Sequence, residues 1–153
     1  MHRVSEVGAV VLVGVLLVCA VAAWWLRTRS GVVRVPAADH VDAEVAVLRG
    51  LGVRPEDADL TVVQFSTSTC APCRATRAQL ERLQADRPRL AVVHVDAEEH
   101  LDAVRALDVR RTPTLFYLDA AGTLVGRGSG APRPDQLAAL VGAHTAAAPG
   151  GVG

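Results

Sequence analysis

The chain has 153 residues, enough for one domain of about 100 residues with further segments at its ends. Hydrophobic residues make up 50% of the chain but aromatic residues only 3%, so the core must consist of valine, leucine and alanine. Sixteen basic residues, all arginine, balance sixteen acidic ones, and no segment gathers positive charge. This balance argues against nucleic-acid binding.

The first element of the chain is an apolar run. Val7–Leu26 contains no charged residue, and its length matches the roughly 20 residues with which an α-helix crosses a bilayer. Trp24 and Trp25 lie near its end, where interfacial aromatic residues collect. The alternative is a cleaved signal peptide, because residues 20–22 (Ala-Val-Ala) resemble a cleavage site, but the run exceeds the usual apolar region of such peptides. We therefore expect an uncleaved transmembrane anchor after the flanking residues 1–6.

The basic residues beside this run predict its orientation. Arg27, Arg29 and Arg34 follow the run, whereas Arg3 and the terminal amine precede it. The flank with more basic residues tends to remain in the cytoplasm. We therefore predict a single-pass membrane protein whose domain lies in the cytoplasm, where its cysteines would rest as thiols.

A linker is predicted for residues 27–41, which contain glycine and proline, with a short strand at Val32–Val35. The domain is expected to occupy residues 42–144. Its first element is a helix that Asp42 would cap and that continues through Arg49, where two nearby glycines end it.

Two cysteines stand between a predicted strand and a predicted helix. Thr61–Phe65 is a β-branched, apolar run typical of a buried strand, and the polar turn Ser66–Thr69 follows it. Cys70 and Cys73 then open a helical pattern, and two cysteines on one first turn can close a small disulfide ring. The unpaired N–H groups of a helix start would favour a thiolate at Cys70.

The residues around the cysteines fit redox chemistry. Pro72 costs the first turn little, because its missing N–H had no helical partner, and Arg74 adds positive charge nearby. The alternative is half of a structural zinc site, which needs four ligands. The one other cysteine, Cys19, lies far upstream, and the five histidines show no paired spacing. We therefore predict a reactive thiolate with a second thiol in reserve, and neither a metal nor an organic cofactor.

The rest of the chain alternates strands and helices. The helix that carries the cysteines is predicted to end near Asp86, before Pro88. The later predicted elements are a strand at Leu90–Val95, a helix at Glu98–Leu107, a hairpin of Thr114–Leu118 with Thr123–Gly128, and a helix from Pro134 or Asp135. Residues 145–153, mostly alanine, glycine and proline, are predicted to be a disordered tail.

This order of elements, with the cysteine pair and a Thr-Pro forty residues after Cys73, resembles the thioredoxin family. The resemblance covers residues 60–143 and implies an α/β, thioredoxin-like fold in which helices flank a central mixed sheet. We expect this fold to follow the N-terminal transmembrane helix.

The resemblance also assigns the substrate-binding residues. In the family the proline is cis and packs against the cysteine pair, which gives that place to Pro113 and lets Thr112 present backbone groups to a substrate's extended chain. An X-Pro bond before a strand fits a cis turn, although a plain strand-starting proline is the alternative. Ala71 and Pro72, between the cysteines, would belong to the same surface.

The sequence departs from the family at the central strand. A buried acid usually takes the proton of the second cysteine there, but this chain has Gln64, whose amide cannot act as a base. Thr69 replaces the tryptophan that usually precedes the first cysteine, and Cys-Ala-Pro-Cys replaces Cys-Gly-Pro-Cys. These changes indicate a narrower choice of partner protein, a different reduction potential or slower turnover. His94 on the neighbouring strand is an alternative base, although a satisfied core or surface histidine is the ordinary interpretation.

We therefore predict a membrane-anchored thiol–disulfide oxidoreductase that acts on protein disulfides. Cys70 would be the nucleophile and Cys73 the resolving thiol, with Gln64 and Arg74 tuning the pair. A reductase or a membrane redox partner would be needed to recycle the Cys70–Cys73 disulfide. The alternatives are a non-catalytic binding module that holds a membrane-bound client, and a redox sensor.

Overall fold

The computed structural model describes residues 2–29, 33–34 and 41–145, and the chain divides into two compact units, 1–30 and 31–153. The first unit contains helix α1 (His2–Arg29), whose described side chains, from residue 11 to residue 24, are all exposed. Among the residues that the structure describes, no helix is long and apolar enough to cross a membrane. The predicted transmembrane anchor at Val7–Leu26 therefore has no support from the structure.

A five-stranded sheet forms the centre of the second unit. The strands lie in the order β1-β5-β4-β2-β3, and only β2 and β3 run parallel to each other. Their bounds are β1 Val33–Arg34, β2 Leu60–Ser66, β3 Leu90–Asp96, β4 Thr114–Asp119 and β5 Leu124–Ser129. The predicted mixed sheet is confirmed, and β2 lies inside it between β3 and β4.

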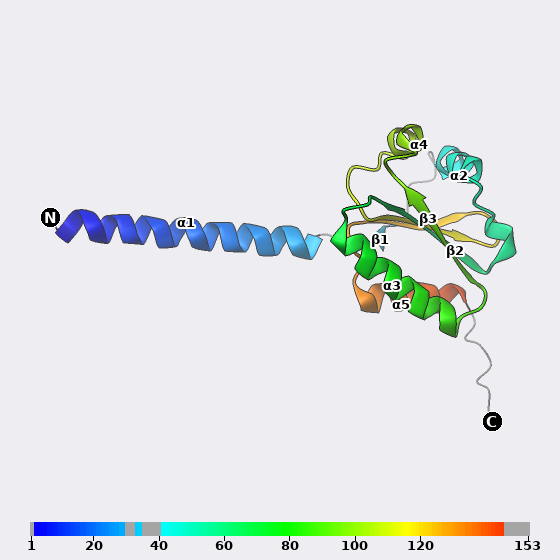
Figure 1. The fold of residues 1–153 in the computed structure, drawn as a ribbon. Helices are drawn as coiled ribbons and strands as arrows, with labels where there is room; N and C mark the ends of the chain where they lie inside the picture. Colours follow the sequence, from blue (N-terminus) through cyan, green and yellow to red (C-terminus); the bar gives the residue numbers. More distant parts are fainter. Residues whose placement is uncertain (1, 30–32, 35–40, 146–153) are drawn as a thin grey trace, which may run out of the picture. The chain divides into compact units, whose positions relative to one another are not determined.

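Helices cover both faces of this sheet (Figure 1). They are α2 Val41–Gly50, α3 Ala71–Asp86, α4 Leu101–Ala106 and α5 Pro134–His144, with a 3₁₀ turn, η2, at Pro55–Asp57. Helices α2 and α4 lie on one face and α3 and α5 on the other, and each pair packs on its own apolar cluster. The predicted arrangement of helices on both sides of the sheet is confirmed.

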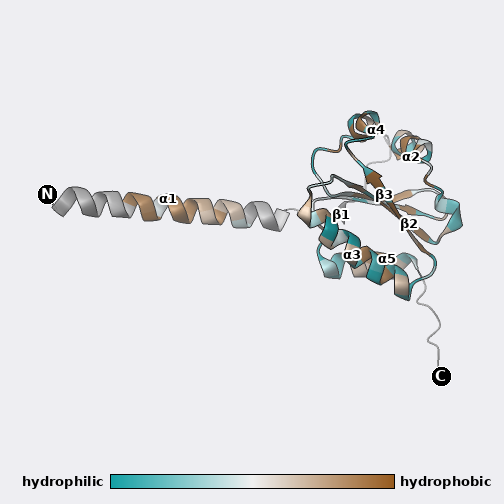
Figure 2. Ribbon diagram, viewed as in Figure 1, coloured by the Kyte–Doolittle hydropathy of each residue, from teal (hydrophilic) through white to brown (hydrophobic). Residues whose placement is uncertain are grey.

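The side chains of β2 explain the two clusters. Successive residues of a strand point to opposite faces, so Leu60 and Val62 face α3 and α5 whereas Val63 and Phe65 face α2 and α4. All four are fully buried. Figure 2 shows the apolar residues concentrated in the sheet and hydrophilic residues on the surrounding helices. A strand that is buried on both faces reads as a continuous apolar run, which is why the sequence predicts it well.

Most predicted elements are confirmed within one residue at either end, but α4 is shorter than predicted. The pattern predicts a helix over Glu98–Leu107, whereas the structure starts it at Leu101. Glu98 lies in a turn instead, because its N–H donates to Oδ1 of Asp96 at 2.7 Å. At the other end Asp108 adopts a left-handed φ of 46°, which terminates the helix.

Two other predicted elements fall partly outside the described residues. The strand expected at Val32–Val35 is present at Val33–Arg34, and its two outer residues lie outside that description. Residues 30–32 and 35–40 of the predicted linker and 146–153 of the predicted tail also lie outside it.

A half-buried ion pair ties β5 to the α2 and α4 face. Nη1 of Arg127 donates to Oε1 of Glu44 at 2.6 Å, and its Nη2 donates to the carbonyl oxygens of Leu107 at 2.6 Å and Asp108 at 3.0 Å. The guanidinium also lies 4.9 Å from the ring centroid of Phe116. One side chain thus connects a strand, the start of α2 and the end of α4.

We predict that Arg127→Met lowers the free energy of unfolding by about 3 kcal/mol, because it leaves the Glu44 carboxylate and two carbonyl groups without their partner. Denaturant unfolding followed by circular dichroism measures this value. Arg105→Met is the matched control, since the Arg105–Asp102 pair is exposed to solvent and should matter little. Equal losses for the two variants would contradict a structural role for Arg127.

Candidate active site

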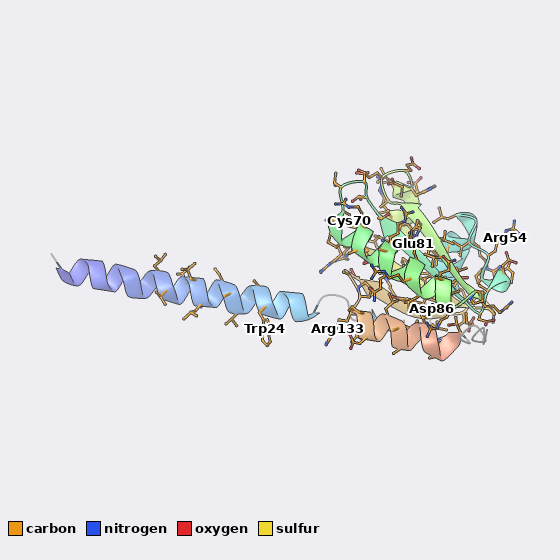
Figure 3. All side chains as sticks on the ribbon, turned by 60° about the horizontal axis from the view of Figure 1, so that its bottom comes forward. Trp24, Arg54, Cys70, Glu81, Asp86 and Arg133 are labelled. Carbon is orange, nitrogen blue, oxygen red and sulfur yellow. A yellow bond between two sulfur atoms is a disulfide. The ribbon has the colours of Figure 1, made fainter. Side chains whose placement is uncertain are left out.

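Cys70 and Cys73 form a disulfide at the start of α3, with an S–S distance of 2.04 Å and 5.2 Å between the Cα atoms. Figure 3 labels Cys70 at this end of the helix. The predicted pairing is confirmed. The structure holds the oxidised form, whereas a cytoplasmic location predicts thiols at rest. These are the two ends of one redox cycle, and the location stays a prediction.

The two sulfurs lie in different environments. Cys70 is the N-cap residue of α3, and its Sγ accepts the backbone N–H of Cys73 at 3.1 Å. It is half-buried, whereas Cys73 is only 4% exposed. A sulfur at the N-cap receives one of the N–H groups that have no partner inside the helix. The helix start therefore favours negative charge on Cys70 and shields Cys73.

The residues between and after the cysteines lie on the surface. Ala71, Pro72 and Arg74 are exposed, and Pro72 stands in the first turn, where a helix tolerates proline. The carbonyl of Pro72 accepts the Thr76 hydroxyl at 3.0 Å. This exposed turn leaves Cys70 open to a macromolecular disulfide.

Pro113 lies directly before β4, and the Thr112–Pro113 peptide bond is cis, as the resemblance implies. Pro113 is buried, and its carbonyl accepts the N–H of Gly130 at 2.7 Å. Thr112 is half-buried. Because Thr114 pairs with Phe65 in the sheet, the proline reaches the end of β2 from which the cysteine loop departs. The sheet register thus brings Pro113 and the cysteine loop to one end of the sheet.

Gln64 joins the central strand to the first turn of α3. It is 1% exposed, and its Nε2 donates to the backbone carbonyl of Cys73 at 2.9 Å. Within the described part of the chain, its Oε1 is buried without a hydrogen-bond partner. The amide therefore holds the helix in place but offers no group that takes up a proton near neutral pH.

His94 lies beside Gln64, because β2 and β3 pair in parallel with these two residues in register. Burial lowers the pKa of His94, the positive charge of Arg77 lowers it further, and Glu81 raises it in part. His94 is half-buried, so its side chain is not fully enclosed in the core.

A polar cavity of about 360 Å³ lies next to the cysteines. The sequence-predicted residues Gln64, Cys70, Cys73 and Arg74 line it together with His94. Sequence reasoning did not place the other lining residues at the site, which are Ser66, Thr67, Ser68, Arg77, Val95 and Asp96. The available signal was that parallel strands β2 and β3 end side by side, so the residues at their carboxyl ends share one edge.

Within the residues that the structure describes, there is no cluster of three or more His, Cys, Asp or Glu side chains that could hold a metal ion. The site instead combines the cysteine pair with one amide, one imidazole, one carboxylate, two guanidinium groups and several hydroxyl groups. Such a set suits thiol–disulfide exchange, in which the sulfurs carry the electrons and a neighbouring group moves a proton.

The chain is similar in sequence and fold to known proteins. Residues 53–143 match the family model described as Thioredoxin. The rice protein Thioredoxin H4-1 is 29% identical over 80 residues, which are 52% of this chain and 60% of that protein. The Arabidopsis thaliana protein Thioredoxin-like 2-2, chloroplastic, is 28% identical over 102 residues, which are 66% of this chain and 40% of that protein. The chain thus spans roughly half the length of these curated relatives.

Solved structures agree with the sequence matches. Fasciola hepatica thioredoxin superimposes with a TM-score of 0.54 at 28% identity, covering 63% of this chain and 90% of that one. Chlamydomonas reinhardtii thioredoxin f2 gives a TM-score of 0.53 at 26% identity, covering 61% and 86%. Because the family model matches more than half of the residues and its two motifs are in place, this chain belongs to the thioredoxin family.

Proposed function

We propose that this protein is a thiol–disulfide oxidoreductase that exchanges disulfides with protein substrates. The observation that carries the proposal is the Cys70–Cys73 disulfide at a helix start, with one sulfur capped by a helix N–H and the other shielded. Membership of the thioredoxin family supports this activity in general.

The exchange proceeds in two steps when the protein acts as a reductant. The Cys70 thiolate attacks one sulfur of the client disulfide, the client S–S bond breaks, and the departing client thiolate takes a proton from solvent. Cys73 then gives up its proton to a base or to solvent and attacks the Cys70 sulfur, which breaks the mixed disulfide and releases the second client sulfur as a thiolate that takes up a proton. Two electrons pass from the cysteine pair to the client, and a reductase or membrane redox partner restores the dithiol.

The client is proposed to bind beside the exposed first turn of α3. Ala71 and Pro72 offer a small, uncharged surface next to Cys70, and Thr112 stands half-buried just before β4. An extended client chain fits here through backbone hydrogen bonds, in the manner of a strand added to a sheet. The proposed roles of Arg74 and Gln64 are to support the Cys70 thiolate and to position Cys73.

A non-catalytic binding module is the second candidate, and Gln64 is the observation that favours it. An amide replaces the acid that usually assists the second cysteine, while the fold and the exposed surface near Cys70 stay intact. Turnover of a disulfide substrate with a dithiol donor separates the two candidates, because a binding module turns nothing over. A redox sensor would also cycle, but its partner affinity would change with the state of the disulfide.

The first prediction concerns the two thiols. Cys73→Ser should capture clients as long-lived mixed disulfides, because Cys70 still attacks and nothing releases the client, whereas Cys70→Ser should capture none. Non-reducing gels after mixing with a disulfide-bonded substrate measure the capture. Pro113→Thr should lengthen the life of the mixed disulfide by loosening the packing where Pro113 and the cysteine loop meet at one end of the sheet.

All variants in this experiment carry Cys19→Ser, since Cys19 is a free and exposed cysteine that would capture clients itself. Capture by Cys70→Ser but not by Cys73→Ser would reverse the assigned roles. Capture by neither variant would support the binding module.

A membrane location is a further part of the proposal, and it rests on the sequence alone. The charge-free run Val7–Leu26 would anchor the chain, and Arg27, Arg29 and Arg34 would keep the domain in the cytoplasm. We predict that the full chain sediments with membranes and resists alkaline extraction, whereas a chain starting at residue 31 does not sediment. Recovery of the full chain in the supernatant, a mature form beginning near Ala23, or a C-terminal reporter active only outside the cell would contradict this.

A further inference from the structure

The second step of the proposed exchange needs a group that takes the Cys73 proton, and Gln64 cannot serve. We propose that His94 accepts this proton through water in the cavity that His94 and Cys73 both line. The inference rests on the proposed function and deepens it, because it names the residue on which release of the client depends.

The sheet register places His94 correctly for this role. Gln64 and His94 are partners across the parallel β2–β3 pair, so their side chains leave the same face of the sheet. That face carries α3, because the Gln64 amide reaches the Cys73 carbonyl there. His94 therefore leaves the sheet on the face that α3 covers, and it lines the same cavity as Cys73.

The cavity supplies a path for the proton. Its volume of about 360 Å³ is many times the roughly 30 Å³ that one water occupies, and its walls carry polar groups. Among the described residues, Gln64 Oε1 is a buried acceptor without a partner, and it shares its carbon atom with the Nε2 that donates to the Cys73 carbonyl. A water that donates to this oxygen would lie in the cavity that Cys73 and His94 also line.

Burial and the neighbouring Arg77 favour the neutral form of His94, which is the form that can take up a proton. Its pKa is lowered by burial and by Arg77 on α3, against the opposing effect of Glu81 on the same helix. Arg74 from α3 and Asp96 from β3 line the same cavity, and Gln64 from β2 is uncharged. An imidazole with a pKa below its usual range is neutral at pH 7 and holds its proton only at lower pH.

The step balances as follows. Cys73 S–H passes its proton to a water, which passes one to the imidazole, and the thiolate forms a bond to the Cys70 sulfur. The bond between Cys70 and the client breaks, and the client leaves with the electron pair as a thiolate. The imidazolium then returns the proton to the departing client thiolate or to solvent, and His94 is neutral again.

The test uses the full chain with Cys19→Ser and a model client made of two copies of one peptide joined by a disulfide. Release of the first peptide reports attack by Cys70, and release of the second reports resolution by Cys73. For the chain with His94 intact, the second release should rise with pH through the His94 pKa and then level off. His94→Gln should remove this inflection and slow the second release on the order of 10²-fold at pH 7. Its residual rate should climb only as Cys73 itself ionises.

Two further variants separate proton transfer from packing. Arg77→Gln removes a positive charge from an exposed side chain, so the inflection should move to higher pH while the plateau remains. Gln64→Asp added to His94→Gln places an acid beside Cys73 and should restore the second release at pH 7. His100→Gln is the matched control, because His100 is exposed and lies outside this cavity, and its profile should not change.

The outcomes are distinguishable from a failure of the proposed function. If the first peptide is never released, the chain is not an oxidoreductase. If both peptides are released but His94→Gln keeps the low-pH inflection, His94 is not the proton acceptor and the proposed function survives. If His94→Gln slows the first and second releases equally, and Gln64→Asp restores neither, the residue acts only through packing and the inference is wrong.

Discussion

The hydrogen bond from Gln64 Nε2 to the Cys73 carbonyl, 2.9 Å long and buried, is the contact on which the site depends. It fastens the first turn of α3 to the central strand. Cys73 therefore stays buried against the sheet, while Cys70 remains partly exposed at the N-cap. A buried amide N–H needs an acceptor, because leaving the donor unpaired costs its full desolvation, and the Cys73 carbonyl is that acceptor. The unequal exposure of the two sulfurs follows from this attachment.

The position of β2 inside the sheet extends the effect of that contact. Its parallel neighbour β3 brings His94 beside Gln64, and its antiparallel neighbour β4 starts directly after Pro113. The thiols, the cis-proline and the imidazole therefore come from separate parts of the chain but meet at one end of the sheet. The apolar clusters on both faces hold β2 in this register, because a slip of one residue would turn Val63 and Phe65 to the wrong face.

With an amide in place of an acid at position 64, two tasks fall to two residues: Gln64 holds the helix start, and His94 takes up the proton. A side chain at position 64 has to hold the helix start, and the amide does so through Nε2. Proton transfer then falls to another group, and the cavity connects Cys73 to a histidine that burial and Arg77 keep neutral. The division leaves no ionised group buried at the central strand, which avoids the cost of desolvating a charge.

Local chemistry determined much of this protein in advance. The continuous apolar run at Thr61–Phe65 predicts a strand that is buried on both faces, and Pro88 predicts the end of α3 at Asp86. The spacing of Cys70 and Cys73 predicts their disulfide, because both lie on one helical turn and need no distant partner. The fold class was implied by the resemblance to the thioredoxin family that this order of elements, the cysteine pair and the Thr-Pro motif carry.

Tertiary structure alone decided the rest, because it depends on which distant residues become neighbours. The late start of α4 results from a hydrogen bond between Asp96 and Glu98 that competes with the helical pattern. Nothing in the sequence distinguishes Arg127 from the other arginines. Only the packing of α2 and α4 against β5 gives it Glu44 as a partner. The juxtaposition of Gln64, His94 and Cys73 likewise requires the β2–β3 register and the docking of α3, neither of which any single stretch of the sequence contains.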